Sequence, residues 1–86
     1  MIGKFAVSKA GHDKAQTYVI ITMKDDFAYL CDGRLKTVDK PKKKRLKHVQ
    51  LVNAQVDQEL LARLASGDCV RNEEIKYAIK KYMEKQ

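Results

Sequence analysis

Apolar and polar residues alternate through the first part of the chain, and this period of two predicts β-strands between residues 4 and 52. The stretches TYVIITM and FAYLC are rich in the β-branched and aromatic side chains that favour a pleated surface. Short strands joined by tight turns predict a small antiparallel barrel or a strongly bent sheet. The predicted strands are residues 4–7, 17–23, 27–31, 35–38 and 46–52.

Turn-forming residues separate these strands. Asp25-Asp26 follows the second strand, where aspartate side chains can bond their own backbone. Asp32-Gly33 is the strongest short hairpin signal, because a type I′ turn needs positive φ at both central residues. Pro41 ends the fourth predicted strand, since it has no backbone donor and fits a turn or a sheet edge. The pattern therefore predicts consecutive antiparallel hairpins.

The last part of the chain changes to the helical period. A first helix, with leucines at helical spacing, is predicted between an N-cap at Asp57 and a stop at Gly67. A second helix is predicted to begin with Asn72 as its N-cap and with Glu73 and Glu74 in its first turn, where the macrodipole favours anions. Its apolar stripe is Ile75, Ala78, Ile79, Tyr82 and Met83.

Length and composition predict one small domain. Eighty-six residues allow a single core, and we predict a mainly β domain over residues 1–86. A small β-barrel over about residues 3–52 precedes a helical C-terminal extension, residues 53–86, that holds two short α-helices. No apolar run approaches the roughly 18 residues that span a bilayer, and the first residues do not resemble a signal peptide. We therefore expect a cytoplasmic protein with no membrane partner and with Cys31 and Cys69 as reduced thiols.

The charge excess is confined to one segment. Residues 34–47, the basic segment, contain eight of the 18 Lys and Arg residues and one acid, Asp39, so the segment carries +7. The other ten basic and ten acidic residues cancel, so the whole net charge of +7 comes from this segment. Concentrated charge creates a local positive potential and indicates a polyanionic partner. A solvated basic loop without a partner is less favourable, because like charges in a small domain repel one another.

A sequence motif near the N-terminus indicates which kind of polyanion this partner is. In GKFAVSKAGHDKAQTYVII a hydrophobic alternation leads into Gly11, Lys14 follows three residues later, and a β-rich run comes next. This resembles the KOW motif of ribosomal proteins and transcription elongation factors, which forms the first hairpin of an SH3-like barrel. Gly11 matches the defining glycine of the turn, where a side chain would clash. Ala15 departs from the motif, because KOW sequences usually have a second glycine there.

The resemblance extends over about residues 3–50. With the DG pair at residues 32–33 and KPKKKRLKH at residues 40–48, the segment is similar to bacterial KOW-domain proteins related to a large-subunit ribosomal protein of archaea and eukaryotes. The resemblance implies an RNA-binding module that acts on ribosomal RNA or at the ribosome, with ribosomal proteins as further partners.

The residues themselves predict the same ligand. Phosphate neutralisation dominates nucleic-acid affinity, and the basic segment supplies the cations. Arg45 and His48 offer planar groups that can stack on a base or read it, and Tyr18 and Tyr29 are either aromatic platforms or core residues. The polar turn of residues 8–14 would join this surface if it lies beside the basic segment. The predicted RNA-binding residues are Lys9, His12, Lys14, Arg34, Lys40, Lys42, Lys43, Lys44, Arg45, Lys47 and His48, with Gly11 at the KOW turn.

The sequence predicts no enzyme, cofactor or small-molecule substrate. The histidines and cysteines lack the close spacing of a zinc site, and no two of the four glycines are close enough to form a phosphate-binding loop.

Other binding functions were compared with RNA binding. The run KPKKKR resembles a nuclear-import signal, but strand-like flanks indicate that it is part of the fold. The joining segment SGDCVRN is long for a helix-turn-helix DNA reader. The alternative to RNA binding is a protein-interaction module that docks an acidic partner of the transcription or translation machinery.

Overall fold

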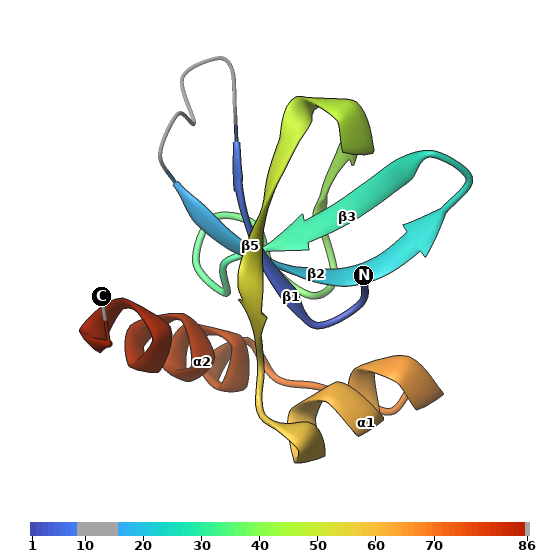
Figure 1. Cartoon of the computed structure of the whole chain (residues 1–86). Coiled ribbons are helices and arrows are strands. Elements are labelled where there is room, and N and C mark those ends of the chain that lie inside the picture. Colours follow the sequence, from blue (N-terminus) through green and yellow to red (C-terminus); the bar gives the residue numbers. More distant parts are fainter. Residues whose placement is uncertain (9–15, 86) are drawn as a thin grey trace.

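A computed structural model of the chain describes residues 1–8 and 16–85 (Figure 1). A five-stranded antiparallel sheet is followed by two α-helices, so the predicted order of a β-rich part and two C-terminal helices is confirmed. The strands are β1 Lys4–Ser8, β2 Thr17–Lys24, β3 Phe27–Cys31, β4 Lys42–Arg45 and β5 Val49–Gln55. The helices are the 3₁₀ turn η1 Leu46–His48, α1 Gln58–Ser66 and α2 Asn72–Glu84.

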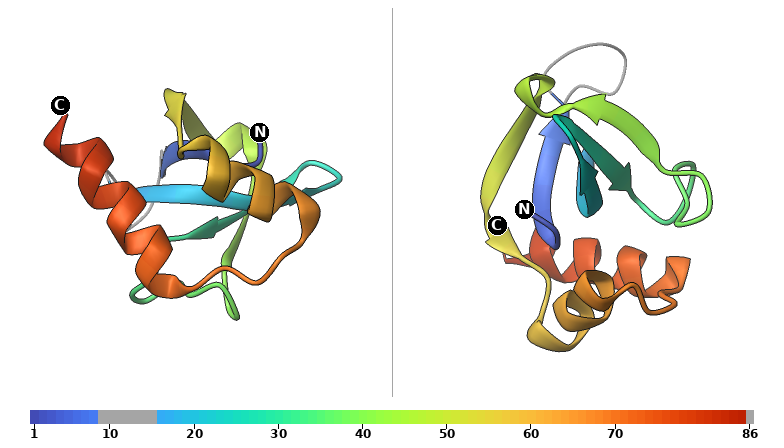
Figure 2. Two further views of the ribbon diagram at one scale, coloured as in Figure 1. Left: turned by 90° about the horizontal axis from the view of Figure 1, so that it is seen from below. Right: turned by 90° about the vertical axis from the view of Figure 1, so that its right-hand side faces the viewer.

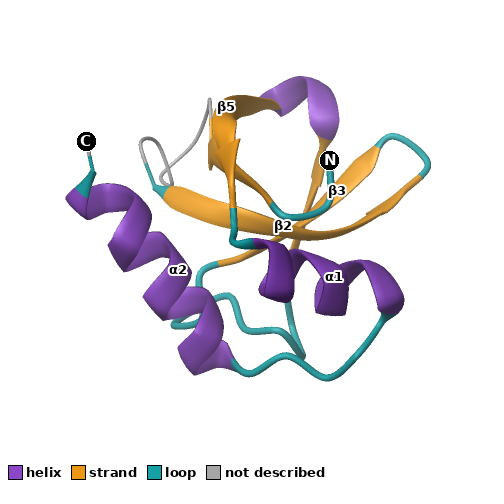
Figure 3. Cartoon of the chain, turned by 60° about the horizontal axis from the view of Figure 1, so that its bottom comes forward, coloured by secondary structure: helices purple, strands orange, loops and turns teal. Residues whose placement is uncertain are grey.

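The strand order in the sheet is β4-β3-β2-β1-β5, so the last strand returns to pair with the first. The sheet is strongly curved, and α1 and α2 lie together on one side of it (Figures 2 and 3). Each face of the sheet buries its own hydrophobic cluster. The inner cluster is Ala6, Tyr18, Ile20, Ala28, Leu30 and Val49. The outer cluster, shared with the helices, is Phe5, Val19, Cys31, Val56, Leu60, Val70 and Ile75.

The tight hairpin turn lies at Asp25-Asp26. Lys24 pairs with Phe27 across these two residues, and Asp25 has a φ of 57°. A positive φ at the first central residue is typical of the turns whose twist matches that of antiparallel strands. The tight turn that joins β2 to β3 is therefore formed by Asp25 and Asp26.

The prediction of a type I′ turn at Asp32-Gly33 is wrong. Asp32 is only 6% exposed, and its carboxylate accepts hydrogen bonds from the backbone N–H groups of Arg34 (2.8 Å) and Lys36 (3.0 Å). These bonds hold residues 32–36 in a loop, and the predicted strand at residues 35–38 does not form. An aspartate that bonds the following backbone favours such a loop over a ladder.

Residues 32–41 are fixed against the start of α2. The backbone N–H of Val38 donates to the side-chain oxygen of Asn72 at 2.9 Å. Gly33 approaches so closely that a Cβ there would lie 2.5 Å from the backbone oxygen of Asn72. The N-cap of α2 is Arg71, one residue earlier than predicted, because the side chain of Asn72 binds this loop instead of capping its own helix.

The run KKKR forms a strand, and the following strand begins later than predicted. β4 consists of Lys42–Arg45, and η1 then carries the chain from one edge of the sheet to the other. β5 covers Val49–Gln55 instead of residues 46–52, because the corner at η1 occupies the first residues of the predicted strand. The helical part consequently begins after Gln55 and not at residue 53.

Local signals end α1 as predicted. The carboxylate of Asp57 accepts a hydrogen bond from the backbone N–H of Leu60 at 2.8 Å, and Gly67 closes the helix in the left-handed region with a φ of 80°. Both end residues of this helix are therefore confirmed.

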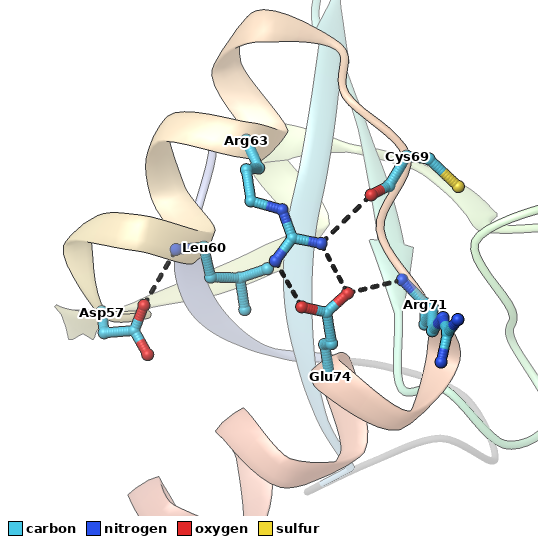
Figure 4. Close-up of polar contacts among 6 residues, drawn as sticks. All are labelled: Asp57, Leu60, Arg63, Cys69, Arg71 and Glu74. Carbon is cyan, nitrogen blue, oxygen red and sulfur yellow. Dashed lines mark hydrogen bonds and ion pairs between the residues drawn. The ribbon is translucent and has the colours of Figure 1, made fainter.

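One arginine joins the two helices (Figure 4). The guanidinium of Arg63 donates to both carboxylate oxygens of Glu74, with 2.7 Å to Oε2, and to the backbone oxygen of Cys69 at 3.1 Å. Glu74 also accepts from the backbone N–H of Arg71 at 2.9 Å. The hydrogen bonds from Arg63 and then from Arg71 lower the pKa of Glu74 to about 2. This network fixes α2 relative to α1.

Candidate nucleic-acid interface

The basic side chains of β4 divide between the two faces of the sheet. Successive residues of a strand point to opposite faces, and cross-strand partners share a face. Lys43 lies opposite Tyr29 and Arg45 opposite Phe27, whereas Lys44 lies opposite the buried Ala28. The run that looks continuous in the sequence is therefore two pairs of cations, one on each face.

The outer face carries cations and aromatic rings together. The Nζ of Lys43 lies 4.4 Å from the ring centroid of Phe27, and the guanidinium carbon of Arg45 lies 5.0 Å from it. Both distances are within the range of cation–π attraction, which contributes about 0.5–1 kcal/mol at exposed sites. On the neighbouring strand β2, Lys24 lies opposite Phe27. We call this surface the outer strip: Lys24, Phe27, Tyr29, Lys43 and Arg45.

Arg45 is held in place without being strongly bound. Its Nη1 donates to the carboxylate of Asp26 at 2.9 Å, and the two side chains are 50% and 64% exposed. An ion pair this exposed contributes about 0–1 kcal/mol, so a phosphate can replace the carboxylate at little cost. Arg45, predicted to read or stack on a base, therefore lies over an aromatic ring on an accessible face.

Lys42 and Lys44 point to the inner face. The Nζ of Lys44 donates to the buried Oγ of Ser8 at 2.6 Å, and the Nζ of Lys42 lies 6.0 Å from the ring centroid of Tyr18. Burial, followed by the charge of Lys44, lowers the pKa of Lys42. Tyr18 is 2% exposed and belongs to the inner cluster. This ring is therefore a core residue and not an aromatic platform for a base.

The other predicted site residues lie on separate elements. Lys47 and His48 are exposed on η1, directly after β4, and Arg34 and Lys40 are exposed in the loop of residues 32–41. Lys9, Gly11, His12 and Lys14 fall outside the described residues, so their place beside the basic segment stays a prediction. The structure thus brings together Lys43 and Arg45, with η1 following directly in the chain, and it separates Lys42 and Lys44 from them.

Phe27 and Lys24 lie in the outer strip but were not among the residues predicted from the sequence. A signal for Phe27 was present, because the period of two in FAYLC places Phe27 and Tyr29 on the face opposite Ala28 and Leu30. How much of that face stays exposed depends on how far the helices extend over it, and the strand pattern does not contain that information.

A groove of about 660 Å³ between β5, α1 and α2 was also not predicted. The stacked rings of Phe5 and Tyr82, with centroids 4.5 Å apart, lie along it, and the 59% exposed Tyr77 stands at its rim. Its walls carry acids such as Glu59 as well as bases such as Lys81, so its charge selects neither an acidic nor a basic ligand.

One of the two cysteines is buried, and the described acids do not gather into a metal site. Cys31 is buried, and loss of hydration raises the pKa of its thiol to about 11, so it is protonated at neutral pH. Within residues 1–8 and 16–85, no three His, Cys, Asp or Glu side chains gather as metal ligands. In the same ranges no helix is long and apolar enough to cross a membrane.

No protein-family model matches the chain, and no curated protein matches it. The resemblance to KOW domains consequently stays a prediction that depends on the motif residues themselves.

Proposed function

We propose that the protein binds RNA through the outer strip and the adjoining η1, and that its curved sheet is a KOW-type, SH3-like barrel that acts on ribosomal RNA or at the ribosome. The observation that carries the proposal is the position of Lys43 and Arg45 over Phe27, in the segment that holds the entire net charge. The short η1 supports the barrel, because three residues join β4 at one edge of the sheet to β5 at the other and so keep the two edges close together.

The physical basis of the binding is the release of counterions. Each cation that meets a phosphate frees condensed ions, and affinity falls with salt by a slope of about 0.9 per contact on a duplex. Lys24, Lys43, Arg45 and Lys47 are exposed on or next to the outer strip. Four such contacts predict about a 150-fold loss of duplex affinity between roughly 50 and 200 mM salt.

A structural explanation for the basic run competes with this proposal. β4 is an edge strand, and lysines on an edge discourage pairing with another chain. If the lysines of β4 served only to prevent pairing with another chain, the protein would not bind RNA at low salt. The two explanations therefore predict opposite results in one assay.

The test measures RNA affinity against salt for two double variants with the same change in charge. Lys43→Gln with Arg45→Gln should lower the slope of log affinity against log salt by about 1.8, since two contacts are lost. The control is Lys81→Gln with Lys85→Gln, which alters two exposed lysines near the end of α2 and should leave the slope unchanged. Equal slopes for both double variants, or no binding by the wild type, would contradict the proposal.

A protein-interaction module that docks an acidic partner is the second candidate. The observation in its favour is the same basic edge strand, because an extended acidic peptide could add to the sheet there and meet its cations. Purification separates the candidates: RNA binding predicts co-purified nucleic acid that high salt removes. Sedimentation of the protein with ribosomes or their subunits in a sucrose gradient then tests the ribosomal assignment.

A further inference from the structure

The two aromatic residues of the outer strip are not core residues. Phe27 and Tyr29 are half-buried, and neither belongs to the hydrophobic clusters of the described residues. Cys31 shares their face of β3 and packs in the outer cluster with Ile75 of α2. The helices therefore cover the end of β3 at Cys31, and the two rings lie on the part of the strand beyond that cluster.

The surroundings of these rings are suited to a nucleotide. Each is flanked on β4 by a cation, since Arg45 lies opposite Phe27 and Lys43 lies opposite Tyr29. Bases stack on aromatic rings and on guanidinium planes, and phosphates bind lysine. The charged groups of Lys43 and Arg45 both lie over the Phe27 ring, so the outer strip gathers two rings and two cations at neighbouring positions.

The spacing of the two rings distinguishes paired from unpaired RNA. Residues i and i+2 of a strand are about 7 Å apart along the sheet, because each residue rises about 3.4 Å. Adjacent bases in a helical stack are separated by only about 3.4 Å. Two successive bases can meet Phe27 and Tyr29 only when they are unstacked, and a duplex keeps its bases inside the stack.

We infer that the outer strip binds unpaired RNA, with bases stacked on Phe27 and Tyr29 and phosphates at Lys24 and Lys43. This inference rests on the proposed RNA binding and names the class of RNA. Arg45, placed over Phe27, adds its guanidinium plane to the stacking surface.

The experiment compares a short single-stranded RNA with a duplex of the same length. Phe27→Leu and Tyr29→Leu keep an apolar side chain and remove the ring, so each should weaken single-strand binding by about 5- to 150-fold, the range for loss of one stacked base. Duplex affinity should stay within about twofold, because phosphate contacts are unchanged. Tyr77→Leu, at an exposed aromatic residue of α2, is the matched control and should change neither affinity.

A second measurement does not depend on the stability of the leucine variants. The chain has no tryptophan, so Phe27→Trp places a single indole on the outer strip and retains a stacking ring. Its emission should be quenched by the single strand and not by the duplex.

The outcomes separate this inference from the proposed function. Equal losses on both RNAs, no loss on the single strand, or equal quenching by both would overturn the inference and leave salt-dependent RNA binding intact. Failure of the wild-type protein to bind either RNA at low salt would overturn both.

Discussion

Replacing Gly33 by alanine tests whether residues 32–41 are packed as tightly against α2 as the structure shows. Gly33 has a φ of 77°, and a Cβ there would lie 2.5 Å from the backbone oxygen of Asn72 and 2.9 Å from the Cγ of Lys76. Gly67, at the end of α1, has a nearly identical φ of 80° and nothing within 4 Å of the same added atom. The two glycines therefore differ in the space around them and hardly in φ.

The magnitudes follow from that difference. An alanine in the left-handed region costs about 1–2 kcal/mol, partly offset by about 0.4–1 kcal/mol from the restricted unfolded chain. Both terms apply equally to Gly33→Ala and Gly67→Ala. Only Gly33→Ala adds the cost of overpacking, about 1–3 kcal/mol, because the nearest atom is backbone and cannot rotate away.

The assay is thermal unfolding of both variants followed by circular dichroism. About 1 kcal/mol corresponds to roughly 4–8 °C in Tm for a domain of this size, so Gly33→Ala should melt at least about 4 °C below Gly67→Ala. Denaturant titration should give the same order with an unchanged m-value. Equal destabilisation by the two substitutions would refute the close contact between Gly33 and α2.

Three further predictions concern the helices and the thiols. Glu74 has a pKa of about 2 against an ordinary 4.5, a depressed value, so its contribution to stability is present above pH 4.5 and is lost as the pH falls toward 2. The Tm difference between the wild type and Glu74→Gln, measured across that window, should therefore shrink with acidification, and a constant difference would contradict the role of the Arg63 hydrogen bonds. Asp57→Ala should cost about 1 kcal/mol through loss of the N-cap, whereas Asp57→Asn should cost much less, as chemical denaturation would show. At pH 8 iodoacetamide should label the exposed Cys69 in the native protein and leave the buried Cys31 unlabelled until denaturation, with mass spectrometry locating the adduct.

The features that could be predicted from the sequence are those with local causes. The ends of α1 were predicted correctly because an aspartate N-cap and a glycine in the left-handed region act within one turn of the helix. β2 and β3 were placed correctly because β-branched and aromatic residues alternate along them. The net charge and its confinement to residues 34–47 are properties of composition and need no fold.

The strand formed by KKKR could not be predicted from local preference. Lysine is depleted in strands, and the competing segment at residues 35–38 is richer in strand-forming residues. Asp32 holds that segment in a loop, and the loop delivers Lys42–Arg45 to the free edge of β3. Pairing with a neighbouring strand overrode intrinsic propensity: at this edge Lys43 and Arg45 project toward solvent, and Lys44 on the other face bonds Ser8.

The sequence by itself determined that the protein carries one concentrated positive surface, since the sum of charges in a segment does not depend on conformation. Only the tertiary structure decided which cations share a face: pairing with β3 places Lys43 and Arg45 beside Phe27 and turns Lys44 toward Ser8. It also decided that the part of this face around Phe27 and Tyr29 is left open, because α1 and α2 cover the same face only near Cys31 (Figure 3). Register between strands and the docking of helices are set by contacts between residues far apart in the chain, and no local pattern contains them.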